Sequence, residues 1–428
     1  MLNEKQFNVH SLNEKQSDVL NCVLNGKNAF ITGFAGSGKS FLIEHICSSL
    51  KENSKIFALT AMTGCAAILI NGRTLHSTLG IGLAKGSPKD ILKRIQRIEG
   101  MIEYLLSLDV LIVDEVSMLS NELFDKIGEI FQILHSSEKP FGRLQIILVG
   151  DMSQLKPIEG DYCFYAKSWD QCKLNIHVLT ENMRVNSDTR FHNLLQKLRW
   201  GIISDMNLID EMKQNDFSES EIVPTKLFST NKDVDSINKH ALELLLKNGN
   251  ESMHYKVNYH SNQLKLIEST KYTFDNKIPE LLTLCVGAQV MVTRNICFDN
   301  QIVNGTRGVI VALNETSVTI KLTNGLLHTL SYFHVKPDRN DHGLMRNIDF
   351  KYIPLCLAWA MTIHKSQGAT IDLLEIDLGE SVFACGQAYV ALSRARNSKC
   401  VKIINFNTRS VRSSKAVKNF YQCCEDLN

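Results

Sequence analysis

The sequence lacks the features that define several other classes of protein. No two of its 12 cysteines are spaced C-x-x-C, which argues against a zinc site or a secreted disulfide framework. No apolar run reaches the roughly 20 residues that cross a bilayer. Residues 1–16 contain Glu4 and Glu14 and no apolar core, so they resemble neither a signal nor a transit peptide. We expect an intracellular protein with free thiols and no membrane partner, nuclear if its source is eukaryotic or viral.

Neither sign of charge dominates the composition. The chain has 47 Lys and Arg against 45 Asp and Glu, a net charge of +2. A nucleic-acid partner would therefore have to be held by local basic patches and not by a global field. At 428 residues, with 44% hydrophobic and 21% charged residues, the chain is globular in composition but too long for one ordinary core. We expect two large domains with insertions.

One stretch fits a phosphate-binding loop. Residues 33–40, Gly-Phe-Ala-Gly-Ser-Gly-Lys-Ser, match G-x-x-x-x-G-K-[ST] at every fixed position. An apolar run at 29–32 predicts a strand before the loop, and the pattern of 41–50 predicts a helix after it. Backbone N–H groups at such a helix start bind phosphate, and the flanking elements disfavour the alternative of a chance glycine-rich turn.

The predicted loop assigns roles to individual residues. Lys39 would reach the β- and γ-phosphates of ATP, and Ser40 would bind Mg²⁺. The predicted nucleotide-binding residues of the loop are Gly33, Ala35, Gly36, Ser37, Gly38, Lys39 and Ser40.

Two neighbouring acids follow another apolar run. Residues 110–113 predict a buried parallel strand, which ends at Asp114 and Glu115. Adjacent carboxylates at a buried strand end would be costly without a cation, so the Mg²⁺ interpretation outweighs a purely structural one. Asp114 would hold the Mg²⁺, and Glu115 would orient or deprotonate the attacking water.

Apolar runs at 56–60 and 145–149 predict two more strands of a doubly wound α/β domain. The second run leads into residues 150–155, where Gln154 is placed to sense a γ-phosphate at the ligand-binding edge of the sheet. A helix predicted over 11–26 carries Gln16. From the residues alone, Gln16 is either an adenine contact or a solvent-exposed helical residue.

Taken in order, these motifs resemble the superfamily 1 DNA helicases of the Pif type, which are relatives of RecD. After the phosphate loop come Asp-Glu-Val-Ser-Met at 114–118 and Gly-Asp-Met-Ser-Gln-Leu at 150–155. Between these two motifs, residues 122–127 and 140–142 resemble the signature of this branch. The similarity continues through residues 163–169, 179–184, 225–238, 287–291, 304–308, 362–368 and 386–394.

The resemblance implies two RecA-like P-loop NTPase domains with ATP in the cleft between them. It also implies that Gln16 contacts adenine and that Arg184 and Arg394 act as arginine fingers when the domains close. The family unwinds duplex DNA from a 5′ single-stranded end. We therefore expect a monomeric, ATP- and Mg²⁺-dependent, 5′-to-3′ helicase that acts in DNA replication, recombination, repair or genome and telomere maintenance.

Two residues depart from the family pattern. Val185 stands where the family usually has Gln after its first finger, and Lys156 precedes Pro157 where the family has two prolines. Neither departure removes a catalytic group.

Composition also predicts the domain limits. We expect a first domain at 1–180, with a strand-splitting wedge at about 72–100, and a second domain at 181–254 and 351–428. Residues 255–350 contain short alternating runs with turn signals, which predict a small β-barrel. This segment is similar to the SH3-like insertion of the family.

The predicted DNA contacts follow strand ends. His364 and Lys365 come after an apolar run at 354–360, expected to be one strand. A lone His is more often structural, but beside Lys and hydroxyl groups, contact with the DNA backbone is favoured. The predicted DNA-binding residues are Thr63, His76, Thr362, His364, Lys365 and Ser366.

Two alternative functions would use the same nucleotide site. One is a DNA-binding ATPase scaffold that does not separate strands, and the other is a small-molecule P-loop kinase. The kinase is disfavoured because it needs neither two arginine fingers nor a second α/β domain.

Overall fold

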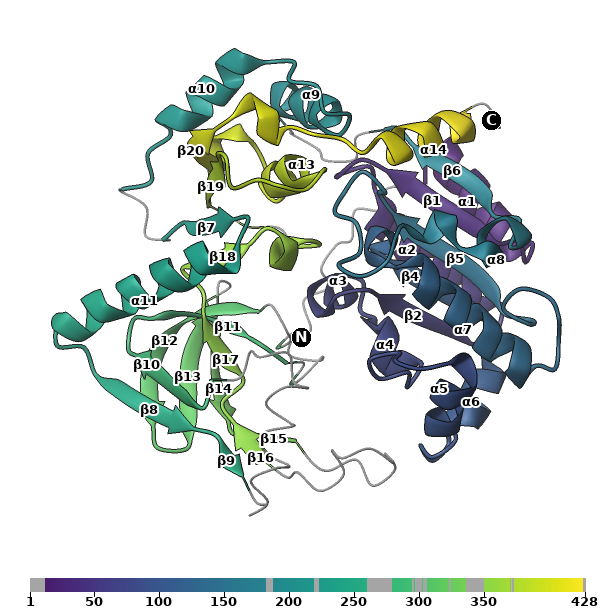
Figure 1. The fold of residues 1–428 in the computed structure, drawn as a ribbon, viewed down its shortest axis with the longest axis horizontal. Helices are drawn as coiled ribbons and strands as arrows, with labels where there is room; N and C mark the ends of the chain where they lie inside the picture. The colour runs from purple at the N-terminus through teal and green to yellow at the C-terminus, as the bar shows by residue number, and fades with distance from the viewer. Residues whose placement is uncertain are drawn as a thin grey trace, which may run out of the picture.

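The computed structural model describes residues 12–181, 188–218, 223–259, 279–294, 296, 302, 306–322, 325–335, 350–369, 371 and 373–425. Arg184, a predicted arginine finger, lies outside these residues, as does Val185. The described chain contains two parallel sheets with helices around them and a group of antiparallel strands (Figure 1).

The first parallel sheet has the strand order β3-β2-β4-β5-β1-β6, and all of its pairings are parallel. Its strands are β1 (Ala29–Gly33), β2 (Phe57–Ala61), β3 (Arg73–Thr74), β4 (Val110–Asp114), β5 (Gln145–Gly150) and β6 (Asn175–Leu179). Four of them begin and end within one residue of the predicted apolar runs. β1 and β4 are buried along their whole length, which explains why they are continuous apolar runs and not alternating ones.

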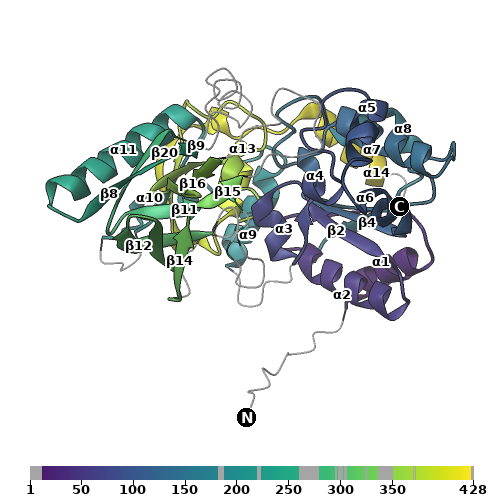
Figure 2. The ribbon, with the colours of Figure 1, turned by 90° about the horizontal axis from the view of Figure 1, so that it is seen from below.

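Helices cover both faces of this sheet. Its helices are α1 (Glu14–Leu24), α2 (Lys39–Glu52), α3 (Gly64–Leu69), α4 (Leu75–Thr78), α5 (Pro88–Ile95), α6 (Met101–Ser107), α7 (Asn121–Leu134) and α8 (Lys167–Gln171). Seen from below, α1, α2 and α3 lie on one side of the sheet, and α5, α7 and α8 lie on the other (Figure 2). Val19, Leu42 and Ile31 share one apolar core, whereas Ile91 and Phe124 belong to the other. This two-faced covering confirms the doubly wound prediction.

The helix α14 (Lys415–Glu425) joins the first sheet although it follows the last strand of the second. Val417 and Tyr421 are buried in the core that contains Phe30 of β1, and the ring of Phe420 stacks on that of Phe164 at 4.4 Å. Figure 1 shows this helix, in yellow, beside β1 and β6. The assignment of all of 351–428 to the second domain is therefore wrong for α14.

The second parallel sheet has the order β18-β7-β19-β20. Its strands are β7 (Thr225–Phe228), β18 (Ala360–Thr362), β19 (Leu374–Leu378) and β20 (Val401–Phe406). The helices around it are α9 (Thr189–Leu198), α10 (Met206–Gln214), α11 (Asn231–Lys247) and α13 (Gln387–Ser393). Short 3-10 turns are η1 (Val116–Met118), η2 (Cys163–Tyr165), η3 (His364–Ser366), η4 (Ser398–Cys400) and η5 (Thr408–Ser410).

Antiparallel strands occupy the lower left of Figure 1. One sheet has the order β14-β13-β12-β11-β17, a second pairs β10 with β8, and a third has the order β15-β16-β9. The strands are β8 (Ser252–Lys256), β9 (Asn258–Tyr259), β10 (Leu281–Cys285), β11 (Gln289–Val292), β12 (Arg307–Asn314), β13 (Ser317–Leu322), β14 (Leu327–Ser331), β15 (Phe333–Val335), β16 (Phe350–Tyr352) and β17 (Leu355–Leu357). The alternating runs at 308–313 and 317–322 are confirmed as the hairpin β12–β13.

The expected single strand over 354–360 is wrong. The chain forms β17, which pairs antiparallel with β11, and then β18, which pairs parallel with β7. Ala358 and Trp359 connect the two strands. β18 is buried throughout, and β17 has one buried and two half-buried residues, all of them apolar. The apolar run is therefore continuous, and composition could not reveal that the chain changes sheets there.

The segment 72–100, predicted to contain the wedge, contributes to the first sheet and its core. It supplies β3 and α4, and Ile91 and Ile95 of α5 are fully buried there. Among the helices described, none combines the length and the hydropathy needed to cross a bilayer.

Candidate active site

The phosphate loop lies between β1 and α2, as predicted. Gly38 precedes the helix with φ +84°, a left-handed conformation that side chains rarely adopt. The ammonium of Lys39 turns back onto the loop and donates to the carbonyl oxygens of Gly33 at 2.8 Å and Phe34 at 3.0 Å. Burial lowers the pKa of Lys39, and nearby carboxylates such as that of Asp151 oppose this shift. The loop therefore presents a cation and a helix N-terminus at one place.

Asp114 and Glu115 lie at the end of β4, as expected. Asp114 is buried, and its carboxylate accepts the N–H of Glu115 at 2.8 Å. Burial, together with the charge of Glu115, raises the pKa of Asp114 to about 7. A cation would relieve both effects, because it favours the ionised carboxylate. Within the described ranges, no cluster of three or more His, Cys, Asp or Glu side chains is arranged to hold a metal.

Gln154 follows β5 in a loop that the second sheet's helix contacts. The helix α13 begins after Gly386, where φ is +79° and an added Cβ would lie 2.5 Å from the Ser153 carbonyl oxygen. A side chain at this position would therefore push the loop away. Gln154 itself is buried, and within the described chain its Oε1 has no hydrogen-bond partner.

Gln16 is 0% exposed, so its interpretation as a solvent-exposed residue is wrong. Its Oε1 accepts the N–H of Asn13 at 3.1 Å, and its own N–H donates to Asn13 Oδ1 at 2.8 Å, which forms a capping box. Within the described residues, the Nε2 of Gln16 has no partner. A buried, unsatisfied amide donor costs stability unless a ligand uses it.

Arg394 lies at the C-terminal end of α13 and is buried. Its guanidinium donates to the carbonyl oxygens of Val390 at 3.0 Å and Ala369 at 3.2 Å, and to Ser393 Oγ at 2.8 Å. These contacts hold the planar group in a fixed orientation within the second half of the chain.

Contacts between the two parallel sheets lie beside the nucleotide loops. Gln367, which follows β18, donates to Ser117 Oγ at 2.9 Å and approaches Glu115 Oε2 at 3.4 Å. From α13, the hydroxyl of Tyr389 accepts the N–H of Ala35 in the phosphate loop at 3.1 Å. The second sheet therefore reaches both the predicted catalytic acid and the phosphate loop.

Sequence reasoning missed several of these residues. Tyr389 and Gln367 lie inside two motifs that carry the family resemblance, residues 386–394 and 362–368. Their position in these motifs could have identified them as candidate site residues. Asp151 lies in such a motif as well, next to the predicted γ-phosphate sensor. No pattern points to Arg199 or Tyr421, which are brought to Asp151 only by packing.

The predicted DNA contacts differ in accessibility. Lys365 is exposed and His364 is half-buried, and the His364 ring stacks on the ring of Phe383 at 6.5 Å. Phe383 is 60% exposed. Ser366 is fully buried and donates to the Ile363 carbonyl at 2.7 Å, so its side chain is not available to DNA. The prediction of Ser366 as a DNA contact is therefore wrong for its side chain.

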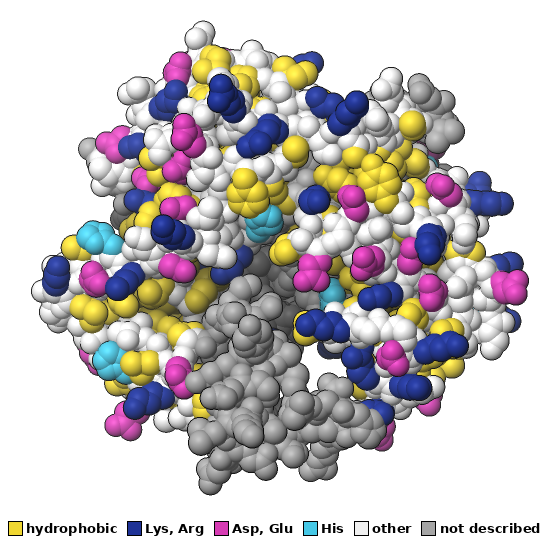
Figure 3. Space-filling model, viewed as in Figure 1, with side chains coloured by type: hydrophobic (Ala, Val, Ile, Leu, Met, Phe, Trp, Pro, Cys, Tyr) yellow, Lys and Arg dark blue, Asp and Glu magenta, His cyan; other side chains and the backbone are white. Residues whose placement is uncertain are grey.

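The other predicted DNA contacts lie at strand ends or near them. Thr362 is largely buried in β18, and its Oγ1 accepts the N–H of Lys365 at 3.4 Å. Thr63 caps α3 by accepting the N–H of Ala66 at 3.2 Å, and His76 is half-buried on α4. Over the face in Figure 3, Lys and Arg side chains are interspersed with Asp and Glu, so that face carries no broad field of one sign.

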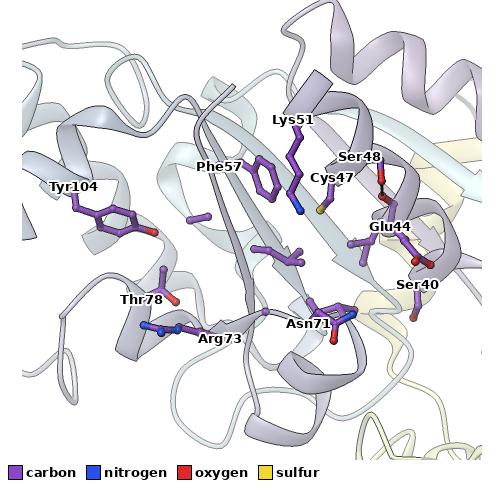
Figure 4. A pocket seen from close by; sticks show the side chains of 15 residues that line it. Ser40, Glu44, Cys47, Ser48, Lys51, Phe57, Asn71, Arg73, Thr78 and Tyr104 are labelled. Atoms are coloured by element: carbon purple, nitrogen blue, oxygen red, sulfur yellow. Dashed lines mark hydrogen bonds between the residues drawn. The ribbon is translucent and has the colours of Figure 1, made fainter. Parts of the chain in front are cut away.

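A pocket of about 420 Å³ adjoins the phosphate loop (Figure 4). It extends along α2 from Ser40 to Lys51 and is bordered by the edge of β2. β3 pairs only with Thr60 and Ala61, which leaves the earlier part of that edge open to the pocket. Ser40, the predicted Mg²⁺ ligand, therefore lies where the pocket meets the nucleotide loop.

A phosphate loop after β1 of a doubly wound sheet, paired acids at the end of β4 in the same sheet and a second parallel sheet against them define a RecA-like α/β nucleotide-binding protein. The family model described as PIF1-like helicase matches residues 11–208, and that of the DNA helicase Pif1 2B domain matches residues 273–313. The chain belongs to the PIF1-like helicase family.

Relatives match nearly the whole chain. The ATP-dependent DNA helicase Pif1 of Bdellovibrio bacteriovorus is 32% identical and aligns with 97% of this chain and 93% of its own length. The ATP-dependent DNA helicase PIF1 of Danio rerio is 36% identical over 96% of this chain. The chain spans 64% of the length of that relative.

Solved structures agree with the fold. The Pif1 helicase from Candida albicans is 31% identical, with a TM-score of 0.86, and covers 97% of this chain and 100% of its own. The Pif1 helicase from Bacteroides in complex with ADP-AlF3 and ssDNA is 28% identical, with a TM-score of 0.79 over 97% of this chain and 98% of its own.

Proposed function

We propose that this protein is an ATP-dependent DNA helicase that moves 5′-to-3′ on single-stranded DNA and unwinds 5′-tailed duplex. The observation that carries the proposal is the contact of Gln367, from the second parallel sheet, with Ser117 and Glu115 in the first. A nucleotide site bordered by two sheets can convert hydrolysis into their relative movement. The Bacteroides relative, solved with ADP-AlF3 and ssDNA, supports both ligands.

The phosphates of ATP would be held by the loop and by Lys39, and adenine by the Nε2 of Gln16. Ser40 and Asp114 would hold Mg²⁺, which supplies positive charge against the β- and γ-phosphates. The raised pKa of Asp114 supports a cation there, because a cation favours the ionised form.

The remaining groups would act on the reacting phosphate. Glu115 would position the attacking water, and Gln154 would sense the γ-phosphate. Arg394, and Arg184 if it reaches the same cleft, would stabilise the charge that spreads over the transferring group.

For the domains, we propose two RecA-like units and an SH3-like insertion with altered limits. The first unit would be residues 12–180 together with α14, since Val417 and Tyr421 pack in its core. The insertion would begin at β8 and end at β17, because both strands pair antiparallel. The wedge within about 72–100 stays part of this proposal.

The DNA would cross both parallel sheets, against Thr63, His76, Thr362, His364 and Lys365. The exposed ring of Phe383 beside His364 supports contact with an unpaired base, since every base offers a face for stacking. Backbone contacts dominate such binding, so it would be sensitive to salt and weakly selective for sequence.

We further propose that a monomer is sufficient for translocation. The protein would act inside the cell, and in the nucleus if its source is eukaryotic or viral. The processes that it would serve are DNA replication, recombination, repair or telomere maintenance. Two coordinating Pif1 helicases act at forked dsDNA in one structural relative. The number of copies on a fork is therefore a separate measurement from the number needed to translocate.

ATP hydrolysis measured with and without oligonucleotide tests the proposal. Single-stranded DNA should stimulate turnover strongly, because DNA favours the closed cleft in which the arginines reach the phosphate. Equal rates with and without DNA would contradict it. A DNA-dependent ATPase scaffold would pass this test and fail to displace a strand.

A further inference from the structure

One peptide group of the phosphate loop is held from both sides. It joins Phe34 to Ala35. Its carbonyl oxygen accepts from the Lys39 ammonium at 3.0 Å, and its N–H donates to the Tyr389 hydroxyl at 3.1 Å. The carbonyl and the N–H of a peptide lie in one rigid plane, so a rotation at one end moves the other.

The Tyr389 hydroxyl uses both its donor and its acceptor capacity. It accepts from Ala35, and it donates to the Asp151 carboxylate at 3.0 Å. Tyr389 is 1% exposed, so water is not available to replace a partner that leaves. Asp151 in turn accepts the N–H of Ser153 at 3.0 Å, in the loop that carries Gln154.

The helix that carries Tyr389 is in contact with nucleotide loops at more than one point. Gly386, at its start, lies so close to Ser153 that an added Cβ would clash. Arg394, at its other end, is five residues beyond Tyr389, about 7–8 Å along a helix. A small rotation of α13 would therefore move the guanidinium together with the phenol.

We propose that the Tyr389 hydroxyl is a positioning group that transmits the state of the phosphate loop to the helix carrying Arg394. Lys39 must leave the carbonyls of Gly33 and Phe34 to bind a phosphate, which frees one side of the peptide that Tyr389 holds by the other. The inference rests on the proposed function of this site. Nucleotide binding and the position of α13 become coupled, because the nucleotide favours one arrangement of that peptide over another.

Tyr421 provides a matched control. Its hydroxyl is also buried and donates to Asp151, at 3.2 Å. Its other partners are Thr32 of β1, at 2.6 Å, and the N–H of Met152 in the loop after β5, at 3.0 Å, so neither belongs to α13 or the second sheet. Tyr421→Phe thus removes a hydroxyl from the same carboxylate and leaves the contact between Ala35 and Tyr389 in place.

Amide hydrogen exchange with and without MgADP tests the proposal in the wild type, Tyr389→Phe and Tyr421→Phe. MgADP should change exchange in 33–40 in all three proteins. In the wild type and Tyr421→Phe it should also change exchange in 387–393 by about tenfold, within the usual range of coupling between sites. In Tyr389→Phe that second change should vanish. The proposal is wrong if MgADP does not change exchange in 387–393 of the wild type. It is also wrong if MgADP changes exchange there in Tyr389→Phe as much as in the wild type.

Activity supplies a second readout. Tyr389→Phe should bind MgADP within about threefold of the wild type, while its DNA-stimulated kcat falls by about 10- to 100-fold, the size of a typical coupling. The melting temperatures of the two Phe variants show whether a loss of stability could explain the fall in kcat. If Tyr389→Phe does not fold, the wild-type exchange in 387–393 decides the matter by itself. Loss of DNA stimulation in the wild type would instead contradict the helicase proposal and leave the exchange result standing.

Discussion

Arg199 and Asp151 form a buried ion pair at the centre of the contacts between the two halves of the chain. The guanidinium donates to both carboxylate oxygens, with distances of 2.9 to 3.1 Å. The side chains are 8% and 0% exposed. The Arg199 guanidinium also lies 4.7 Å from the ring of Tyr421 and 4.8 Å from that of Trp200.

Replacing Asp151 by Asn should destabilise the protein by about 3–5 kcal/mol, because it leaves the buried guanidinium without its counter-charge. Urea unfolding measures this loss. Asp210→Asn is the control, since Asp210 pairs with Lys213 on the surface, where such pairs contribute about 0–1 kcal/mol. Equal losses in the two variants would mean that the buried pair contributes no more than an exposed one.

The same pair predicts a dependence on pH. Burial alone would raise the pKa of Asp151, but Arg199, Lys39 and hydrogen bonds outweigh it, and the pKa is lowered overall. A carboxylate with a lowered folded pKa stabilises the fold above its unfolded value, about 3.9, and less as pH falls below it. The stability difference between the wild type and Asp151→Asn should be constant above about pH 5 and shrink below about pH 4. A difference that grew in acid would contradict the lowered pKa.

Replacing Lys39 by Ala should abolish ATP hydrolysis and leave DNA binding nearly unchanged. The ammonium is the one phosphate-loop group that combines a charge with the reach to the γ-phosphate. Steady-state ATPase rates and oligonucleotide binding by fluorescence anisotropy measure the two effects. Normal turnover in Lys39→Ala would mean that the loop does not bind the reacting nucleotide.

Loss of Arg394 should reduce turnover by about 10³-fold, within the range for arginine fingers, and nucleotide affinity much less. Arg394→Lys should be nearly as slow, because Lys keeps the charge but loses the planar fork. The exposed Arg409 provides the control variant, Arg409→Ala. A stable Arg394→Lys protein with near-normal DNA-stimulated ATPase would show that the guanidinium only anchors Val390 and Ala369.

Replacing His364 and Lys365 together by Ala should weaken oligonucleotide binding and leave ATP binding nearly unchanged. Affinity for DNA should also fall steeply between low and high salt, because phosphate contacts release counterions. Lys399→Ala, an exposed cation near β20, is the control for net charge. An affinity that stayed the same across salt concentrations would contradict backbone tracking.

The first sheet was predictable because buried parallel strands are short, continuous apolar runs that end in functional motifs. The positions of Lys39, Asp114 and Glu115 followed from those strand ends alone. The second half was harder. The run over 354–360 contains two strands of different sheets, and both environments favour the same apolar residues.

The packing partners of individual side chains could not be predicted from the sequence either. Nothing in the sequence of α14 says which of the two cores receives Val417 and Tyr421. For the same reason the ion pair of Arg199 with Asp151, 48 residues apart, has no signature in the chain. Side chains that are distant in sequence and come together only in the folded protein can be identified only from the structure.

Strand displacement on three matched substrates tests directly whether this protein unwinds DNA in the 5′-to-3′ direction. The substrates carry a 5′ tail, a 3′ tail or blunt ends on the same duplex, and Lys39→Ala serves as the inactive control. We expect ATP-dependent displacement from the 5′-tailed duplex and none from the other two. Displacement from the 3′-tailed duplex, or DNA-stimulated ATP hydrolysis without displacement from any substrate, would contradict it.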